Sequence, residues 1–442
     1  MIESTIAATR RQMLALGMLV AAGAVRAQAQ PKITMLINQS PWFDGFKKVV
    51  ERYEKDTGNR VELDVTPFGG MLEKTRNSLR ASAGTYDLVA LNAMWINEVY
   101  GGGFLQALDE IEPGYRLPAN VLDFDQSVYW NDAKKSFDPS GRVLGVPVNG
   151  NVQVLYFRRD LYKEKGLKEP TTWAELEANA KALHNPAAGV YGFGIRGDRG
   201  SATYDVSPFI YSHGGRIFKD ERNGDYTVAL SSAASLKGLE TYIRLARDYG
   251  PPSPWAMSQD KLIQLMATGK VAHAVAVIAV WGALDDPKKS AVVGKFDAAL
   301  MPRGEPGRHA SAAGHWVAGI ARNVPAERKR AAMAFLKWFV RQEVQVAYVQ
   351  AGAVPVISGL GEAQFGKDDR YRFLEALSEN SRNSVFYAPV KERVEINDLI
   401  GLKVNQALLG ELTPKDALNQ AAEGIHDIAR KAGYKTGRGE IL

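Results

Sequence analysis

The sequence predicts an α/β fold with mostly parallel sheets, because short strand-like runs alternate with segments of helical periodicity. "ITMLI" and "YDLVAL" are apolar enough for buried strands, and "RVELDV" alternates in the manner of a half-buried strand. Between the first run and "RVELDV", apolar side chains recur at helical spacing at Phe46, Val49, Val50 and Tyr53. The 442 residues, of which 45% are hydrophobic, exceed what one compact core accommodates, so we expect two domains.

Residues 1–29 are predicted to be an export signal that is removed. Arg10 and Arg11 precede a short apolar run, and the small residues Ala27 and Ala29 suit a cleavage site. The run is too short to span a bilayer, which needs about 20 apolar residues. Because "TRRQML" is similar to a twin-arginine signal, Sec and Tat export both stay open. The mature protein is expected in the periplasm.

Charge and composition exclude several kinds of function. The net charge of +6 is spread among acidic residues, and the basic residues gather in pairs such as Lys47-Lys48 rather than in long blocks, so nucleic acid is not a predicted partner. With no cysteine, the chain has no disulfide, thiol nucleophile or thiolate metal site. The six histidines, His309 and His315 among them, lack ligand spacing, so we predict no metal and no cofactor.

The turns after the three predicted strands all carry an aromatic residue. They read "NQSPWF", "TPFGG" and "NAMW". Because ligands of parallel α/β sheets bind outside the carboxyl ends of the strands, these turns are expected to lie together at one edge.

The later elements continue the alternation. "PTTWAELEANAKAL" predicts a helix that begins at Thr171 or Thr172, with Glu175 near the capping-box position. "FDAALMP" is strand-like, one helix is expected over 325–352, and an amphipathic helix over 413–433 closes the chain. Without an internal repeat or a low-complexity linker, two lobes joined by short strands fit best.

Several segments together resemble one known family. The first are "FKKVVERYEKDTGNRVELDV" and "GTYDLVALNAMWINEVYGGGFLQALDE", and then "LGVPVNGNVQVLYFRRDLYKEKGLKEPTTWAELEANAKAL". "GKVAHAVAVIAVWGAL", "GHWVAGIAR", "AMAFLKWFV", "GAVPV" and "ALLGELTPKDALNQAAEGI" follow. In this order they resemble the extracellular solute-binding proteins of ABC importers, carbohydrate-binding group, which includes the maltose-binding protein. The chain departs from the common pattern of this family at two places. Arg158 stands where an Asn is more usual, and "NAMW" lacks the acidic residue that some sugar-binding members carry just after the second strand.

The resemblance implies a two-lobe periplasmic-binding-protein fold, each lobe a mostly parallel sheet flanked by helices, with three crossings between lobes. It implies a monomer, not an enzyme, that captures a sugar, oligosaccharide or polyol in the interlobe cleft and delivers it to an ABC transporter permease. Closure is expected about Val146, Pro147 and Val148 and about Leu300, Met301 and Pro302. The implied division is a signal peptide (1–29), an N-terminal lobe (30–146 and 303–341) and a C-terminal lobe (147–302 and 342–442).

A sugar site needs aromatic faces for C–H groups and polar edges for hydroxyls, and the loops supply both. Core packing is the alternative for each aromatic, and turn chemistry around Gly150 is the alternative for its neighbouring asparagines. Trp42 is the predicted platform, Phe43 is expected to anchor the loop, and Phe68 is assigned to the core. The predicted ligand-binding residues are Asn38, Gln39, Trp42, Phe43, Asp44, Asn92, Trp95, Asn149, Asn151, Trp281, His315, Trp316 and Tyr387.

Three alternatives to a sugar-binding protein stay open. An exported glycoside hydrolase would need two carboxylates about 5 to 9.5 Å apart, yet the acids stand in no recognisable motif and the loops are richer in amides. A polyamine site would need several cleft carboxylates, for which Asp44, Glu98 and Asp205 are the candidates. A peptide ligand also stays open, and a neutral carbohydrate is the favoured ligand.

Overall fold

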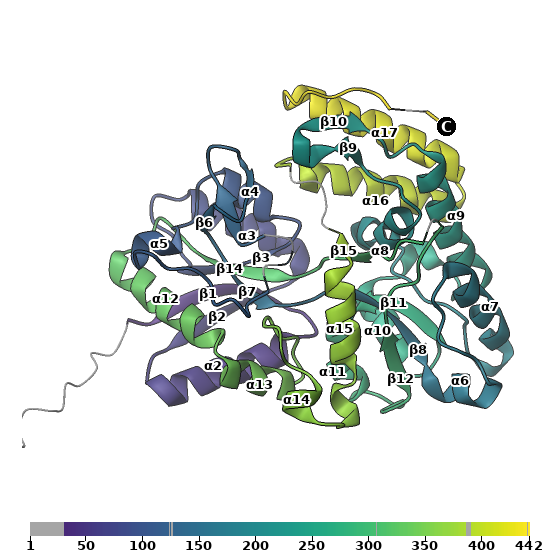
Figure 1. The fold of residues 1–442 in the computed structure, drawn as a ribbon, viewed down its shortest axis with the longest axis horizontal. Helices are drawn as coiled ribbons and strands as arrows, with labels where there is room; N and C mark the ends of the chain where they lie inside the picture. Colours follow the sequence, from purple (N-terminus) through teal and green to yellow (C-terminus); the bar gives the residue numbers. More distant parts are fainter. Residues whose placement is uncertain (1–30, 123, 125–126, 306, 386–389, 440) are drawn as a thin grey trace, which may run out of the picture.

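The computed structural model describes residues 31–122, 124, 127–305, 307–385, 390–439 and 441–442, which fold into two lobes lying side by side (Figure 1). Lobe one holds a five-stranded sheet in the order β2-β1-β3-β14-β7. Lobe two holds a three-stranded sheet in the order β11-β8-β12. The predicted two-lobe α/β architecture is confirmed. The predicted signal peptide lies outside the described residues.

The sheet of lobe one brings the predicted turns together. β1 (Ile33–Asn38) pairs in parallel with β2 (Val61–Thr66) and with β3 (Leu88–Asn92), so the carboxyl ends of all three strands meet at one edge. β14 (Trp316–Ile320) returns antiparallel between β3 and β7 (Val146–Asn149). The other elements of lobe one are α2 (Phe43–Thr57), α3 (Phe68–Arg80), α4 (Ile96–Gly101), α5 (Leu108–Ile111), β4 (Tyr129–Asn131), β5 (Ser136–Phe137), β6 (Arg142–Val143), α12 (Ala326–Phe339) and α13 (Gln342–Gln350).

The strand directions in lobe two differ from the prediction. β8 (Gln153–Arg158) pairs antiparallel with both β11 (His273–Val277) and β12 (Phe296–Ala299), so the main sheet of lobe two is antiparallel rather than mostly parallel. The other elements of lobe two are α6 (Arg159–Lys165), α7 (Trp173–Leu183), α8 (Arg199–Ser212), β9 (Phe218–Asp220), β10 (Asp225–Val228), α9 (Ala233–Asp248), α10 (Gln259–Ala267), α11 (Trp281–Leu284), β13 (Ser311–Ala312), α14 (Glu362–Phe365), α15 (Phe373–Arg382), β15 (Ser384–Val385), α16 (Arg393–Leu409) and α17 (Pro414–Lys431).

Local signals account for several helix ends. Thr172 caps α7 by accepting from the Glu175 N–H, and the Glu175 carboxylate accepts from the Thr172 N–H, so the predicted capping box is confirmed. The single helix predicted over 325–352 is instead two, because Arg341 takes an extended conformation between α12 and α13. The Gln345 amide donates to the Phe339 carbonyl at 2.8 Å and thereby satisfies a backbone group at this break.

Two segments cross between the lobes side by side. After β7 the chain enters β8, and the returning chain pairs with it at Val152 and Ala313. The Gly314 N–H donates to the Asn151 carbonyl at 3.0 Å. Val146 to Val148 therefore lie in lobe one directly before the first crossing.

The second crossing comes later in the chain than expected. The residues named for it, Leu300, Met301 and Pro302, follow β12 within lobe two, where the Met301 N–H donates to the Asn380 side chain at 3.0 Å. α13, assigned to the C-terminal lobe, packs against α2 of lobe one, with the Tyr348 ring 6.4 Å from the Phe46 ring. The exact division into lobes stays a prediction.

His273 is a buried histidine of lobe two whose protonation should govern part of the acid stability. It donates from Nδ1 to the Gly192 carbonyl at 2.6 Å and accepts at Nε2 from the Tyr162 hydroxyl at 2.6 Å. Burial lowers its pKa from 6.5 to about 4. The unfolded chain therefore binds more protons between these values, so stability is lost as pH falls through this window.

We expect this histidine to contribute a loss of about 3 kcal/mol between pH 7 and pH 4, from about 1.4 kcal/mol per pKa unit. Denaturant unfolding of the wild type and of His273→Gln at both pH values measures it. The variant should lose less stability on acidification. Equal losses in both proteins would show that His273 does not stay neutral in the folded state.

Among the described residues, no helix has both the length and the apolar character needed to cross a membrane.

Candidate functional site

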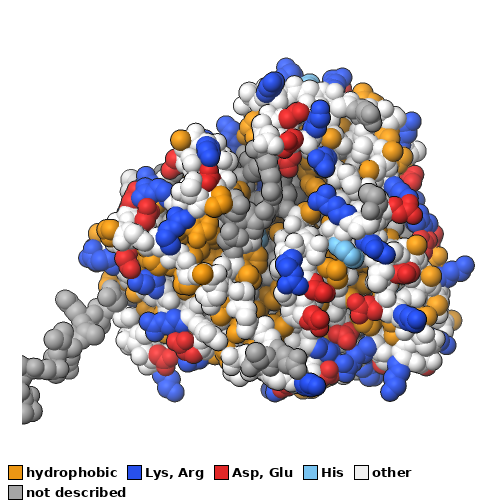
Figure 2. All heavy atoms as spheres, viewed as in Figure 1, with side chains coloured by type: hydrophobic (Ala, Val, Ile, Leu, Met, Phe, Trp, Pro, Cys, Tyr) orange, Lys and Arg blue, Asp and Glu red, His pale blue; other side chains and the backbone are white. Residues whose placement is uncertain are grey.

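The carboxyl ends of the lobe-one strands bring polar and aromatic residues to one place. Asn38, Thr66 and Asn92 end β1, β2 and β3, and Trp316 begins β14 opposite both Asn92 and Asn149. Residues from five parts of the sequence therefore meet at the edge of lobe one where the crossings leave it. Figure 2 shows the surface hollowed along the boundary between the lobes, with apolar side chains on its flanks.

Four aromatic rings form a connected cluster at this edge. Phe68 lies 4.9 Å from Trp95 and 6.1 Å from Trp316, and Trp316 lies 6.1 Å from Trp42. The three tryptophans are 1 to 3% exposed, whereas Phe68 is 40% exposed. Phe68 is therefore the ring of this cluster that a ligand can cover, although the sequence assigned it to the core. The sequence did carry a signal for an aromatic residue at this edge, because Phe68 in "TPFGG" comes directly after a predicted strand.

The residues in and next to the first predicted turn, "NQSPWF", do not all lie where the sequence predicted. Trp42, the predicted platform, packs in the core of lobe one against Phe46 at 5.7 Å, so we exclude it from the site. Phe43 is buried as the first residue of α2, which fits an anchoring role. Asp44 forms an ion pair at 3.0 Å with Lys289 of lobe two. Gln39 is exposed at the same edge.

Buried amides stand beside the aromatic cluster. Asn38 is 3% exposed, and its Oδ1 has no hydrogen-bond partner among the described residues. The side-chain oxygen of Asn92 accepts from the Met94 N–H at 3.0 Å. Asn149 accepts from the Asn151 N–H at 3.0 Å, which is the turn chemistry raised as the alternative for this pair.

The crossing segment itself forms the floor between the lobes. Asn151 accepts at its side-chain oxygen from the Ala279 N–H at 3.2 Å and so ties the first crossing to lobe two. His315 is fully buried, stacks on Phe124 at 4.8 Å, and lies 2.8 Å from the Ser127 hydroxyl through Nε2. Burial lowers the His315 pKa to about 3, so this histidine is neutral at physiological pH.

Lobe two contributes a tyrosine that the sequence reasoning missed. The Tyr204 hydroxyl donates to the Ala312 carbonyl at 3.0 Å, directly before β14, and its half-buried ring lies 5.0 Å below the Arg196 guanidinium. Arg196 in turn pairs with the fully buried Asp205, which also accepts from the Gln153 amide at 2.7 Å. Tyr204 is thus held at the crossing by a buried charge network.

Asn397 of α16 is a second missed residue on this side. Its carbonyl accepts from the Thr203 hydroxyl at 2.6 Å, which places it beside the turn of α8 that carries Tyr204. The side chain is 8% exposed, and neither its nitrogen nor its oxygen has a hydrogen-bond partner among the described residues. Because a buried unpaired amide is costly, the Asn397 side chain keeps hydrogen-bonding capacity that no described residue uses. An Asn inside a helical run carries no sequence signal of such an unpaired amide.

Trp281 lies apart from this arrangement. It is 5% exposed, its indole N–H donates to the Arg370 carbonyl at 3.0 Å, and the Arg372 guanidinium lies 4.3 Å from its ring. It lines a cavity of about 220 Å³ where α11 meets the end of α13, a contact between the lobes. Tyr387, the remaining predicted ligand residue, lies outside the described residues.

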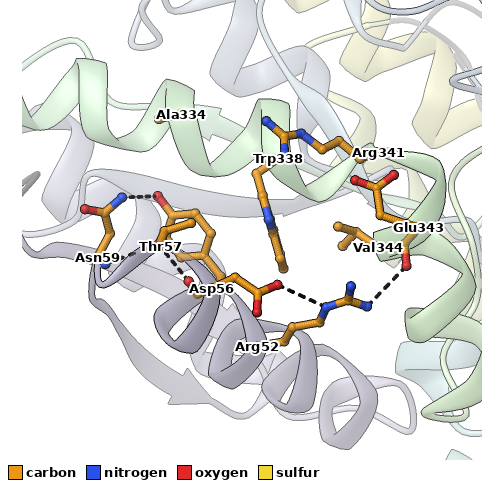
Figure 3. Close-up of a pocket in the computed structure, with 10 residues that line it drawn as sticks. Arg52, Asp56, Thr57, Asn59, Ala334, Trp338, Arg341, Glu343 and Val344 are labelled. Atoms are coloured by element: carbon orange, nitrogen blue, oxygen red, sulfur yellow. Dashed lines mark hydrogen bonds and ion pairs between the residues drawn. The ribbon is translucent and has the colours of Figure 1, made fainter. Parts of the chain in front are cut away.

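A cavity on lobe one, between α2 and the α12–α13 corner, has a different character (Figure 3). It holds about 330 Å³, and Arg52 on its wall donates to Asp56 and to the Glu343 carbonyl, both at 3.2 Å. Trp338 in the same wall is only 6% exposed. Little aromatic face is available there, so this cavity does not suit a sugar.

Comparison with known proteins agrees with this architecture. Residues 38–346 match the model of the bacterial extracellular solute-binding protein family, and the chain belongs to that family. The match covers the first crossing, the second crossing and both walls of the interlobe groove except α16.

Individual relatives are distant but span most of the chain. The mannitol-binding protein of Pseudomonas aeruginosa is 24% identical over 82% of this chain and 84% of its own length. A protein of Sinorhizobium fredii named as a probable amino-acid ABC transporter periplasmic-binding protein is 24% identical over 94% of this chain and 93% of its own.

Solved structures show the same fold. A ribitol complex of an ABC transporter solute-binding protein from Agrobacterium radiobacter superposes with a TM-score of 0.77 at 24% identity, covering 90% of this chain and 99% of that one. A maltose-bound protein of T. maritima superposes with a TM-score of 0.76 at 24% identity and the same coverage. These structures share the fold of the chain, whose family is that of the bacterial extracellular solute-binding proteins, and the Sinorhizobium relative is named as periplasmic.

Proposed function

We propose that this protein captures a neutral sugar or polyol between its lobes and delivers it to the membrane permease of an ABC transporter, without catalysing a reaction. The ligand would lie between Phe68 of lobe one and Tyr204 and Asn397 of lobe two. The aromatic faces suit the C–H groups of a carbohydrate, and the unpaired side-chain oxygen of Asn38 and the unpaired amide of Asn397 suit its hydroxyls.

The observation that carries this proposal is that each candidate carboxylate for binding a cationic ligand already forms an ion pair with a basic residue of the protein. Asp44 pairs with Lys289 at 3.0 Å, and Glu98 pairs with Arg76 at 2.7 Å. Asp205 is buried against Arg196. A polyamine would therefore find no uncompensated carboxylate among these three, whereas the neutral amides remain available to a neutral ligand.

The named ligands of the relatives support the same class. Mannitol, ribitol and maltose share hydroxyl groups and lack charge. The Sinorhizobium relative favours an amino acid as the second candidate, so amino acids belong in any ligand test.

Closure of the two lobes around the ligand would let the permease distinguish the ligand-bound protein from the ligand-free protein. Periplasmic binding proteins close by hinge motion around their ligand, and here the paired crossings at Val152 and Ala313 are the proposed hinge. The ligand stabilises the closed form only to the extent that it binds that form more tightly. The permease would then recognise the closed arrangement of the two lobes.

The test of the site is Phe68→Ala. Because Phe68 is 40% exposed in the aromatic cluster at the edge of lobe one, we expect ligand affinity to fall about 10- to 100-fold, the usual range for an aromatic anchor. Thermal unfolding without ligand should be nearly unchanged. Isothermal titration calorimetry with the best sugar or polyol measures the affinity.

Val293→Ala is the matched control, because Val293 is 42% exposed and belongs to lobe two away from the site. It should bind like the wild type. Unchanged affinity in Phe68→Ala would remove Phe68 from the proposed site.

A further inference from the structure

A cavity of about 580 Å³ lies on lobe two and is lined only by residues of that lobe. Its walls are the loop 250–255, the ends of α9 and α16, and the segment around Tyr191. None of the residues of the proposed transport site lines it. Its size is within the range of about 300 to 1,000 Å³ that small-molecule sites occupy.

The loop that forms one wall is held in a fixed conformation. It contains three prolines, and Ser253 has a φ of 59°, a left-handed conformation that is costly for a residue other than glycine. The Asn405 amide donates to the Trp255 carbonyl at 2.8 Å, and Arg247 donates to the Leu408 carbonyl at 2.8 Å. The cavity is therefore formed before any ligand arrives.

The lining combines ring faces with polar edges. Trp255 and Tyr191 are half-buried, and Leu409 is 40% exposed beside them. His184 and Asp248 line the same cavity and supply a donor and an acceptor for hydroxyl groups. Trp255 differs in this respect from Trp338 of the lobe-one cavity, whose ring is almost covered.

We propose that this cavity is a second carbohydrate site, which binds a single pyranose ring against Trp255 and Tyr191. A ring sugar fits better than an acyclic polyol, because the aromatic lining from Trp255 and Tyr191 favours a ligand with flat C–H faces. A cation is disfavoured, because Asp248 is accompanied by Arg247 in the same wall. This site is separate from the transport groove and does not depend on which solute the groove takes.

Fluorine NMR of protein labelled with 5-fluorotryptophan tests the proposal, with the Trp255 resonance assigned by its loss in Trp255→Phe. Maltose is the ring probe and D-mannitol the acyclic probe. The Trp255 resonance should shift with maltose, with half-saturation at about 1 mM, and should not shift with mannitol. The shift should persist in Phe68→Ala, where groove binding is weakened.

Leu409→Asp places a carboxylate in the cavity at an exposed position and should weaken the maltose response at least tenfold. Val293→Asp, at a similarly exposed position of the same lobe, should respond like the wild type. The proposal is overturned if Trp255 does not shift up to about 20 mM maltose, a concentration well above millimolar affinity. It is equally overturned if Leu409→Asp responds like the wild type, or if the shift disappears in Phe68→Ala.

Discussion

Replacing Trp42 with alanine should lower the free energy of unfolding by about 3 to 5 kcal/mol, the usual cost of deleting a buried tryptophan side chain. Trp42 is 1% exposed, and its ring contacts Phe46 edge-on at 5.7 Å and Trp316 at 6.1 Å. Its loss would leave a cavity beneath the carboxyl ends of the lobe-one strands. Denaturant unfolding without ligand measures the effect.

Phe68→Ala is the comparison, because the two rings belong to one aromatic cluster but differ in exposure. We expect a cost below about 1 kcal/mol for Phe68, as for most exposed positions. Trp42→Ala with wild-type stability and no ligand binding would contradict this account. That result would restore Trp42 as the sugar platform.

Asp205→Ala should destabilise the protein by a similar amount, about 3 to 5 kcal/mol, because it leaves a buried arginine without its counter-charge. The Asp205 carboxylate is fully buried and accepts from the Arg196 backbone N–H at 2.6 Å and from Arg196 Nε at 2.9 Å. Since Gln153 at the start of β8 donates to the same carboxylate, the change should also disturb the wall that carries Tyr204.

Asp398→Ala is the matched control, since its partner Arg199 and Asp398 itself are both more than half exposed. Its cost should stay below about 1 kcal/mol, as for surface ion pairs. The double variant R196M/D205L should recover much of the lost stability, because the unpaired charge is gone. If Asp205→Ala unfolds like Asp398→Ala, the buried pair does not support this wall.

The parallel direction of the first three strands of lobe one and their shared carboxyl edge could be predicted from the sequence. Three strand-like runs with helical segments between them indicate that β1, β2 and β3 run parallel, and this direction brings Asn38 and Asn92 to the same edge. The capping box at Thr172 could also be predicted, because its two partners, Thr172 and Glu175, lie within one helical turn of each other.

Exposure of the individual aromatics could not be predicted. Trp42 is covered by Trp316, which arrives from a strand much later in the chain, whereas Phe68 at the next turn stays open. The antiparallel sheet of lobe two and the late second crossing likewise depend on contacts distant in sequence, such as Val152 with Ala313. The helix break at Arg341 carries no glycine or proline to mark it.

The central claim is that the groove takes a neutral polyhydroxylated solute. Isothermal titration calorimetry tests it most directly, with ribitol, D-mannitol and maltose compared with L-amino acids and spermidine. We predict saturable binding of at least one sugar or polyol, which at 100 times its Kd would add about 2.7 kcal/mol of stability. Binding of spermidine or an amino acid with no response to any sugar or polyol would contradict the account.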